Sequence, residues 1–246
     1  DMNYPHFLGA WRRLDDAWLE HGIEVSRAHG IAHTPTLVAI AGTVVSRNWS
    51  SWRATPGMQL WPPHLRDGVW SGEVGFGPAR FASDADIEMV REATVQMART
   101  ARTLHEAGIP LHTGTDANAP NLVPGASLHR ELELLAAAGI SVPDVLSAST
   151  RRSPAFLGIE GAGTLAEGSP AEFAIYRDDP TRDLAALGSL LAVVRDGRLY
   201  TRADLEERLA RYRAHYEGPA FQRVVMPPLR LALRTLTDWL RARRDS

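Results

Sequence analysis

The chain has 246 residues, of which 44% are hydrophobic and 23% are charged, and its formal net charge is −2. This composition is typical of a globular protein with a sizeable core, and it excludes a strongly basic nucleic-acid-binding surface and a membrane-spanning run of ~20 apolar residues. All 27 Lys/Arg positions are arginine and cysteine does not occur, so lysine and thiolate chemistry are excluded and any metal ligand here must be His, Asp or Glu.

The first predicted element is a helix within residues 1–30. Apolar residues from Trp11 to Trp18 fall at helical spacing, with charged residues between them. The next segment, 31–40, is short, apolar and rich in β-branched residues, which predicts a buried strand. Pro35 lies inside this segment and either marks the end of the strand or weakens the prediction.

Residues 41–82 are the least regular part of the chain, with prolines and glycines among six aromatic side chains. A loop of this length in a compact domain is usually functional or mobile. The aromatic side chains either wall a substrate pocket or pin the loop to the body of the protein, and the sequence leaves both interpretations open. They are Trp49, Trp52, Trp61, Trp70, Phe76 and Phe81.

Residues 84–107 give the clearest helical pattern. Ser83 is a good N-cap with Asp86 three residues later, one apolar stripe runs along the helix, and Gly108 ends it. Residues 108–117 follow at once as a strand. The order strand, loop, helix, strand predicts a βαβ unit, in which the two strands are parallel neighbours.

Asp116 is the main candidate site residue, because it presents a carboxylate where this second strand gives way to a loop. Gly114 leaves room beside the backbone, and Thr113 and Thr115 are β-branched residues that favour a strand. On an α/β scaffold, the C-terminal ends of strands are where sites are built. Asp116 could equally turn the chain or cap the next helix, and this stretch alone does not decide between the two.

The rest of the chain changes character near residue 160. Helices are predicted over 128–138 and 143–157, and a small β unit follows, with strands over 171–176 and 190–195 and a hairpin turn at Asp196-Gly197. Residues 202–246 form two arginine-rich amphipathic helices, broken at Gly218-Pro219 and at Pro227-Pro228. Such a tail either packs on its own protein, which we favour, or binds a membrane surface.

Four pieces of the sequence, in order, resemble the C-terminal half of the amidohydrolase superfamily. They are similar to its imidazolonepropionase-like and Xaa-Pro dipeptidase-like branch over roughly residues 30–200. Three departures stand out: Gly168-Ser-Pro-Ala-Glu172 replaces the usual G-K-x-A-D, His112 stands where a small or apolar residue is common, and the 201–246 tail lies outside the pattern. The four pieces are His33-Thr-Pro-Thr-Leu-Val38, Gly108–Ala117, Ser127–Ile140 and Gly163–Gly197.

The resemblance implies an α/β fold: the C-terminal part of a (β/α)8 TIM barrel, with its last two strands and helices, plus strands of a composite β-sandwich and a helical tail. The corresponding divisions are 1–160, 161–201 and 202–246. The family's first-strand H-x-H metal ligands do not occur here, and about 30 residues precede the first matching strand, too few for six units of ~30 residues each. We therefore expect a C-terminal fragment that is inactive alone, with the missing N-terminal half of the barrel as its partner.

For activity, the resemblance implies a metal-dependent amidohydrolase that cleaves an amide or cyclic-amide C–N bond with one or two divalent metal ions, zinc being favoured. Asp116 would be both a metal ligand and the catalytic acid–base group, accepting the proton of the activated water and passing it to the leaving nitrogen. His129 is either a substrate-binding residue or a locally bonded histidine at a helix start. His112 is interpreted as a hydrogen-bonded core residue.

The expected partners are a small-molecule or dipeptide-like amide substrate and the missing half of the barrel. Nucleic acid is not expected, membrane binding is disfavoured, and a homo-oligomer is left open. The compartment is undetermined, with the cytoplasm favoured. The alternative function is a non-catalytic, truncated relative that binds a partner through its open edges, its aromatic loop and its basic helices.

Overall fold

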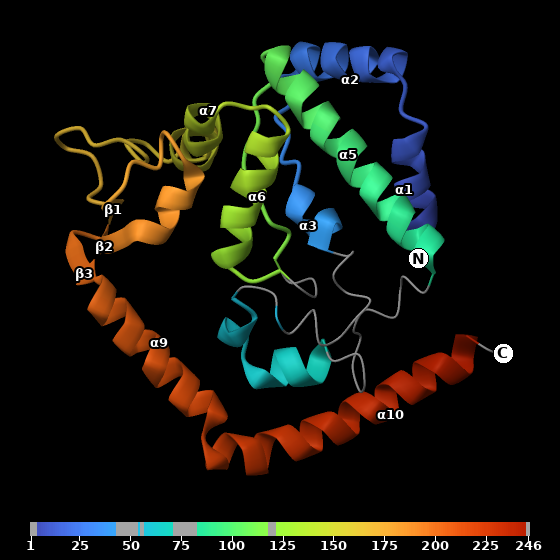
Figure 1. The fold of residues 1–246 in the computed structure, drawn as a ribbon, viewed down its shortest axis with the longest axis vertical. Coiled ribbons are helices and arrows are strands. Elements are labelled where there is room, and N and C mark those ends of the chain that lie inside the picture. The colour runs from blue at the N-terminus through green and yellow to red at the C-terminus, as the bar shows by residue number, and fades with distance from the viewer. Residues whose placement is uncertain (1–3, 43–53, 55–56, 71–82, 118–121, 245–246) are drawn as a thin grey trace.

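The computed structural model describes residues 4–42, 54, 57–70, 83–117 and 122–244 (Figure 1). The prediction of a single helix around Trp11 and Trp18 is wrong. Two helices are present, and Asp15 lies between them. The Asp15 carboxylate accepts a hydrogen bond from the backbone N–H of Trp18 and so caps the second helix, which ends at Gly30 with φ of 62°. The two helices are α1 (Tyr4–Arg12) and α2 (Asp16–His29).

The segment predicted as a strand over 31–40 is extended only in its first half. The backbone N–H of His33 donates to Pro110 O at 3.0 Å, and His112 N–H donates to His33 O at 2.9 Å, which forms a single parallel bridge between His33 and Leu111. The second half is a helix, α3 (Leu37–Ala41), which begins after Thr36 takes a left-handed conformation with φ of 48°. The two segments are parallel neighbours, as predicted, but over one bridge only.

Helix α5 (Asp84–Glu106) lies between these two extended segments in the sequence, as predicted. Ser83 Oγ accepts from the N–H of Asp86, and the Asp86 carboxylate accepts from the N–H of Ser83, which completes a capping box. The buried stripe of α5 packs against α1 and α3 in the main core. Its members are Ile87, Val90, Ala93, Met97, Ala101 and Leu104.

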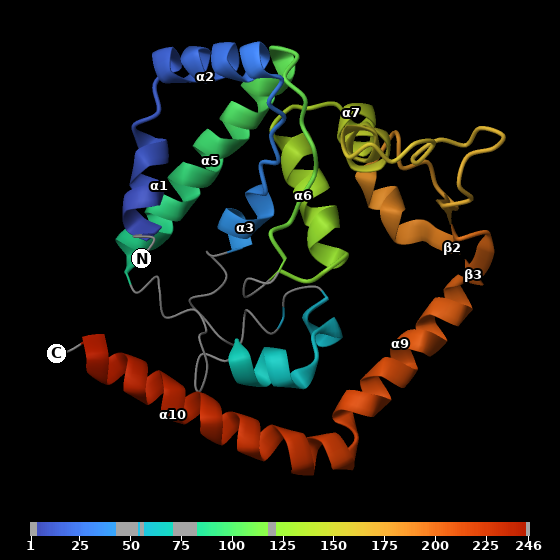
Figure 2. The ribbon, with the colours of Figure 1, turned by 180° about the vertical axis from the view of Figure 1, so that it is seen from behind.

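The helices after Asp116 close the other side of this core. In Figures 1 and 2, α3 lies between α5 and the first of these helices. The two predicted helices are present, although the second contains a π-helical turn. The elements are α6 (Ala126–Ala137), α7 (Val142–Ser147), the π-helical turn Ala148–Arg152 and α8 (Ser153–Phe156).

A three-stranded antiparallel sheet forms the predicted small β unit. The strand order is β1-β2-β3, and Asp196 and Gly197 both take the positive φ that a tight hairpin turn requires. Phe173, Ile175 and Leu199 remain between 38% and 55% exposed. In the register of the sheet they share one face, so this apolar face is incompletely covered. The strands are β1 (Phe173–Tyr176), β2 (Leu190–Arg195) and β3 (Arg198–Thr201).

The C-terminal arm consists of α9 (Arg202–Glu217), a π-helical turn and α10 (Met226–Arg244), and it runs around the rest of the molecule (Figure 2). The break at Gly218 is confirmed. The break at Pro227-Pro228 is wrong, because both prolines lie in the first turn of α10, where proline is tolerated. None of the described helices is long and apolar enough to cross a membrane.

The arm packs on residues 57–70 of its own chain. Tyr212 Oη donates to Leu60 O at 2.7 Å, and the His64 ring lies 5.6 Å from the Phe221 ring. The favoured interpretation of the tail, packing on its own protein, is therefore confirmed.

Candidate functional site

Asp116 ends the extended segment that begins after α5. Its side chain is exposed and its φ is 54°, a left-handed conformation that aspartate tolerates better than most residues. Asp116 therefore does turn the chain. It is not a helix cap among the described elements, since α6 has Gly125 at its N-cap position. Within the described part of the chain, no hydrogen bond to the Asp116 carboxylate is found.

The end of this segment lies directly against the residues that precede α3. A Cβ placed on Gly114 would come within 2.5 Å of Thr34 Cγ2 and 3.3 Å of Thr36 Cγ2. The glycine is therefore required by the close approach of the two threonine side chains to its backbone, as the sequence suggested. Asp116 is thus presented beside the turn at Thr36.

His112 is a hydrogen-bonded core residue, as predicted. Its side chain is buried, its ring centroid lies 4.6 Å from that of Phe156, and its Nδ1 lies 3.2 Å from Ser153 Oγ. Ser153 Oγ donates its proton to Ala148 O, so His112 Nδ1–H must be the donor to Ser153. Burial lowers the pKa of His112, and the nearby Arg152 guanidinium lowers it further.

His129 is exposed near the start of α6. Among the described residues, no hydrogen bond or ion pair to its ring is found, so the alternative of a locally bonded histidine gains no support. Its role in substrate binding stays a prediction.

Glu131, two residues later on α6, was missed by the sequence analysis. Its side chain is completely buried, and Glu131 Oε2 accepts from the backbone N–H of Val38 at 2.7 Å. Burial raises the pKa of Glu131 to about 7, although hydrogen bonds from the backbone of residues 36–38 oppose the shift. A glutamate three residues after Leu128 and four before Leu135, on the apolar face, was the available signal.

Two of the aromatic residues predicted either to wall a pocket or to pin the loop are described, and both pack inward. Trp61 is buried with Met58 and Val123, and Trp70 packs against this cluster. For these two residues the pinning interpretation is confirmed. The other four, Trp49, Trp52, Phe76 and Phe81, lie outside the described residues.

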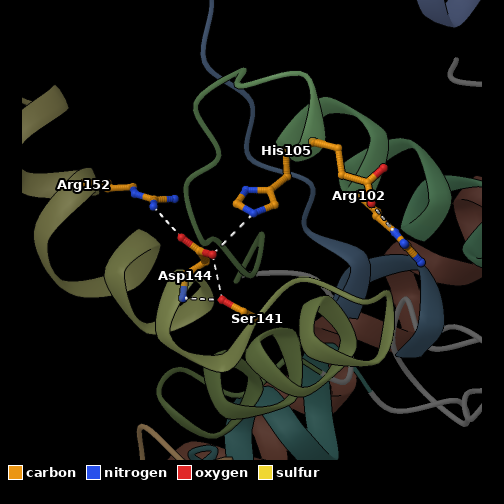
Figure 3. A network of polar contacts seen from close by, with 6 residues as sticks. Arg102, His105, Ser141, Asp144 and Arg152 are labelled. Carbon is orange, nitrogen blue, oxygen red and sulfur yellow. Dashed lines mark hydrogen bonds and ion pairs between the residues drawn. The ribbon is translucent and has the colours of Figure 1, made fainter.

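A polar cluster around Asp144 lies where α5 ends and the extended segment that leads to Asp116 begins (Figure 3). Asp144 accepts hydrogen bonds from Ser141 Oγ and from the Arg152 guanidinium, both at 2.7 Å, and lies 3.6 Å from His105 Nε2. The Ser141 hydroxyl, followed by Arg152, lowers the pKa of Asp144. The cluster joins α5 to α7, at the opposite end of the segment from Asp116, so we assign it a structural role.

The described residues do not by themselves make a metal centre. Across 4–42, 57–70, 83–117 and 122–244, no three His, Asp or Glu side chains gather closely enough to hold an ion. A catalytic zinc site ordinarily uses three protein ligands. Asp116 alone therefore does not meet the requirement, and a site with three ligands would take at least one of them from outside the described residues.

Comparison with known proteins finds a family model, a curated relative and solved structures that agree with one another. The amidohydrolase family matches residues 17–200. An imidazolonepropionase of Ralstonia nicotianae (strain ATCC BAA-1114 / GMI1000) is 36% identical over 101 residues, which cover 39% of this chain and 24% of that protein.

Two solved structures have similar folds. A bottromycin amidohydrolase is 27% identical with a TM-score of 0.61, over 85% of this chain and 46% of that one. A Xaa-Pro dipeptidase with bound methionine has a TM-score of 0.50 at 17% identity, over 77% of this chain and 38% of that one, and shares the fold alone. This chain thus spans less than half the length of each of these three relatives. It belongs to the amidohydrolase superfamily, in its imidazolonepropionase-like branch.

Proposed function

We propose that this chain supplies the C-terminal part of a metal-dependent amidohydrolase, including its catalytic aspartate, Asp116. The observation that carries the proposal is the family match over residues 17–200, within which Asp116 stands exposed at the end of a segment paired in parallel with His33. The reaction is hydrolysis of an amide or cyclic-amide C–N bond. The names of the imidazolonepropionase and the bottromycin amidohydrolase support this reaction class.

In this proposal the two extended segments are the last two strands of a (β/α)8 barrel. Helix α5 connects them, as the crossover helix of a βαβ unit does, and their single bridge is parallel. Residues 1–160 then form the barrel part, 161–201 part of a composite β-sandwich and 202–246 the helical extension. The exposed apolar face of the β1–β3 sheet supports the proposal that another layer of this sandwich covers it in the whole protein. An uncovered apolar face of this kind is unfavourable in water.

The proposed metal, zinc being favoured, would supply an activated water and polarise the scissile carbonyl when bound. Asp116 contributes one carboxylate, and the remaining ligands come from the missing half of the barrel. The Asp116 carboxylate accepts a proton from the attacking water and passes it to the leaving nitrogen. His129 would bind a carboxylate or carbonyl of a small-molecule or dipeptide-like substrate.

The test is Asp116→Asn in the assembled enzyme, that is, this chain joined to or co-expressed with its upstream partner. Asn keeps the shape and tolerates the left-handed backbone but cannot accept the proton. We expect kcat to fall about 10²-fold or more, with an unchanged melting temperature.

Asp196→Asn is the matched control, since Asp196 is also an exposed aspartate with positive φ, in the β2–β3 turn. Its activity should stay at the wild-type level. Near-normal turnover in Asp116→Asn would retire the assignment of the catalytic residue.

A second candidate function is a non-catalytic binding module, favoured by the exposed apolar sheet face. The coding sequence before Asp1 discriminates between the two functions. An H-x-H motif about two hundred residues upstream, the length of six βα units, supports the enzyme. A reading frame that starts at this chain supports the binding module.

A further inference from the structure

Glu131 is the one completely buried ionisable side chain in the described part of the chain that the proposed reaction does not use. Its Oε2 accepts from Val38 N–H at 2.7 Å, whereas its Oε1 is buried and has no hydrogen-bond partner among the described residues. A buried carboxylate is unfavourable unless hydrogen bonds compensate for its lost hydration. A buried glutamate whose hydrogen bond goes to the first turn of another helix therefore indicates a specific structural role.

The group held by Glu131 is the turn that begins α3. Thr36 has φ of 48°, a left-handed conformation that is rare for a β-branched residue, and its own side chain makes no cap hydrogen bond. The first N–H groups of a helix need acceptors, which a Ser, Thr, Asp or Asn at the N-cap usually provides. Here Glu131 provides the acceptor from α6, more than ninety residues away in the sequence.

The same turn touches the segment that ends at Asp116. The methyl groups of Thr34 and Thr36 lie so close to Gly114 that a Cβ there would overlap with Thr34. Gly114 is two residues before Asp116. A displacement of the Thr36 turn would therefore be transmitted to the backbone that carries Asp116, because groups packed this closely cannot move independently.

From this chain of contacts we infer that Glu131 is a positioning residue, which holds the Thr36–Val38 turn against Gly114 and so fixes the direction of Asp116. The consequence for catalysis rests on the proposed function of Asp116, whereas the mechanical link does not. Burial raises the pKa of Glu131 to about 7, and no charged side chain of α3, α5, α6 or α7 contributes to that shift.

Amide hydrogen exchange of the full 246-residue chain tests the link. In Glu131→Leu, the amides of residues 36–38 should exchange at least ~tenfold faster, and those of 113–116 should follow, while the amides of α9 keep their wild-type rates. Glu133→Gln is the matched control, because Glu133 lies on the same helix but is exposed and paired with Arg130. Equal exchange at residues 36–38 in Glu131→Leu and Glu133→Gln would overturn the inference.

A second measurement needs no destabilised variant. In wild-type protein, the amide NMR shifts of residues 36–38 and 113–116 should titrate together with the Glu131 carboxyl, and this titration should vanish in Glu131→Gln. If residues 36–38 titrate but 113–116 do not, the link to Asp116 is wrong.

In the assembled enzyme, Glu131→Leu should lower kcat about tenfold with an unchanged KM, because a displaced acid–base group slows the chemical step. Glu131→Gln, which keeps an acceptor oxygen, should recover most of that loss. An active Asp116→Asn enzyme would contradict the proposed function while leaving the exchange and titration results intact, so the two failures are distinguishable.

Discussion

Thr36, Asp116 and Asp196 are the non-glycine residues with positive φ in the described part of the chain. The two aspartates are residues that tolerate this conformation. Thr36 is not, because its β-branched side chain crowds the backbone. The hydrogen bond from Val38 N–H to Glu131 stabilises the turn that Thr36 begins, so the conformation at Thr36 depends on a residue distant in the sequence.

Glu131 should make the stability of the chain depend on pH. Its pKa is raised from an ordinary 4.5 to about 7 in the folded protein, so the folded state binds the proton more tightly than the unfolded state. The stabilisation by the proton is complete below pH 4.5 and is lost as the pH rises through 7, a change of about 3 kcal/mol.

Urea unfolding between pH 4.5 and pH 8 measures this dependence, with Glu131→Gln as the comparison. The variant should lack the decrease in the free energy of unfolding over that range. The same decrease in both proteins would show that another group titrates.

Gly114 should not accept a side chain. In Gly114→Ala the new Cβ would come within 2.5 Å of Thr34 Cγ2, a short branched group that can yield only if the two segments separate. We expect a loss of about 1–3 kcal/mol in the free energy of unfolding, as for other overpacked sites. Gly188→Ala is the control, since nothing lies within 4 Å of its added Cβ. Chemical denaturation of both variants checks the prediction, and equal stability would contradict it.

At the scale of elements, the C-terminal arm is held by a narrow buried stripe on α10. Met226, Leu233 and Thr237 are buried, and Leu233 lies against Gly68 in the segment 57–70. Other apolar side chains of α10 are exposed, for example Leu231 at 69% and Trp239 at 49%. The position of the arm therefore depends on a few contacts with an otherwise irregular segment.

Leu233→Ala should weaken this docking by about 2–4 kcal/mol, the usual effect of removing a buried leucine side chain. Limited proteolysis should then cut near Gly218 faster than in the wild-type protein. Leu231→Ala, on the exposed side of the same helix, serves as the control and should behave as wild type. If the two variants are cleaved at equal rates, the arm is not held by this stripe.

At the scale of the whole molecule, the described residues form one main core and a sheet whose apolar face is incompletely covered. The core joins α1, α3, α5, α6 and α7, whereas Phe173, Ile175 and Leu199 stand outside it. An exposed apolar face of this kind is typical of an interaction surface, which agrees with the proposed missing layer.

The chain alone should therefore bind a hydrophobic dye such as ANS, and the assembled enzyme should bind markedly less. The expected difference follows from burial of the β1–β3 face by the missing strands. A soluble monomer of the chain alone that melts sharply and binds no dye would contradict the proposal of a missing half.

Local signals in the sequence were sufficient for several elements. The capping box at Ser83, the bounds of β2 and the hairpin at Asp196-Gly197 are all as predicted, because each depends on residues a few positions apart. The family resemblance likewise rests on short ordered motifs, and the family match confirms it.

Only the tertiary structure decided the features that join distant residues. The helix Leu37–Ala41 stands where a strand was predicted, and its first turn is held by a hydrogen bond from Val38 N–H to a carboxylate on α6. The arm rests on 57–70 because Tyr212 bonds to Leu60 O and the His64 and Phe221 rings meet. The sequence by itself determined the capping box at Ser83, the hairpin turn at Asp196-Gly197 and the family. Packing decided the turn at Thr36 and the position of the arm, since burial and long-range hydrogen bonds are properties of the folded chain and leave no local pattern.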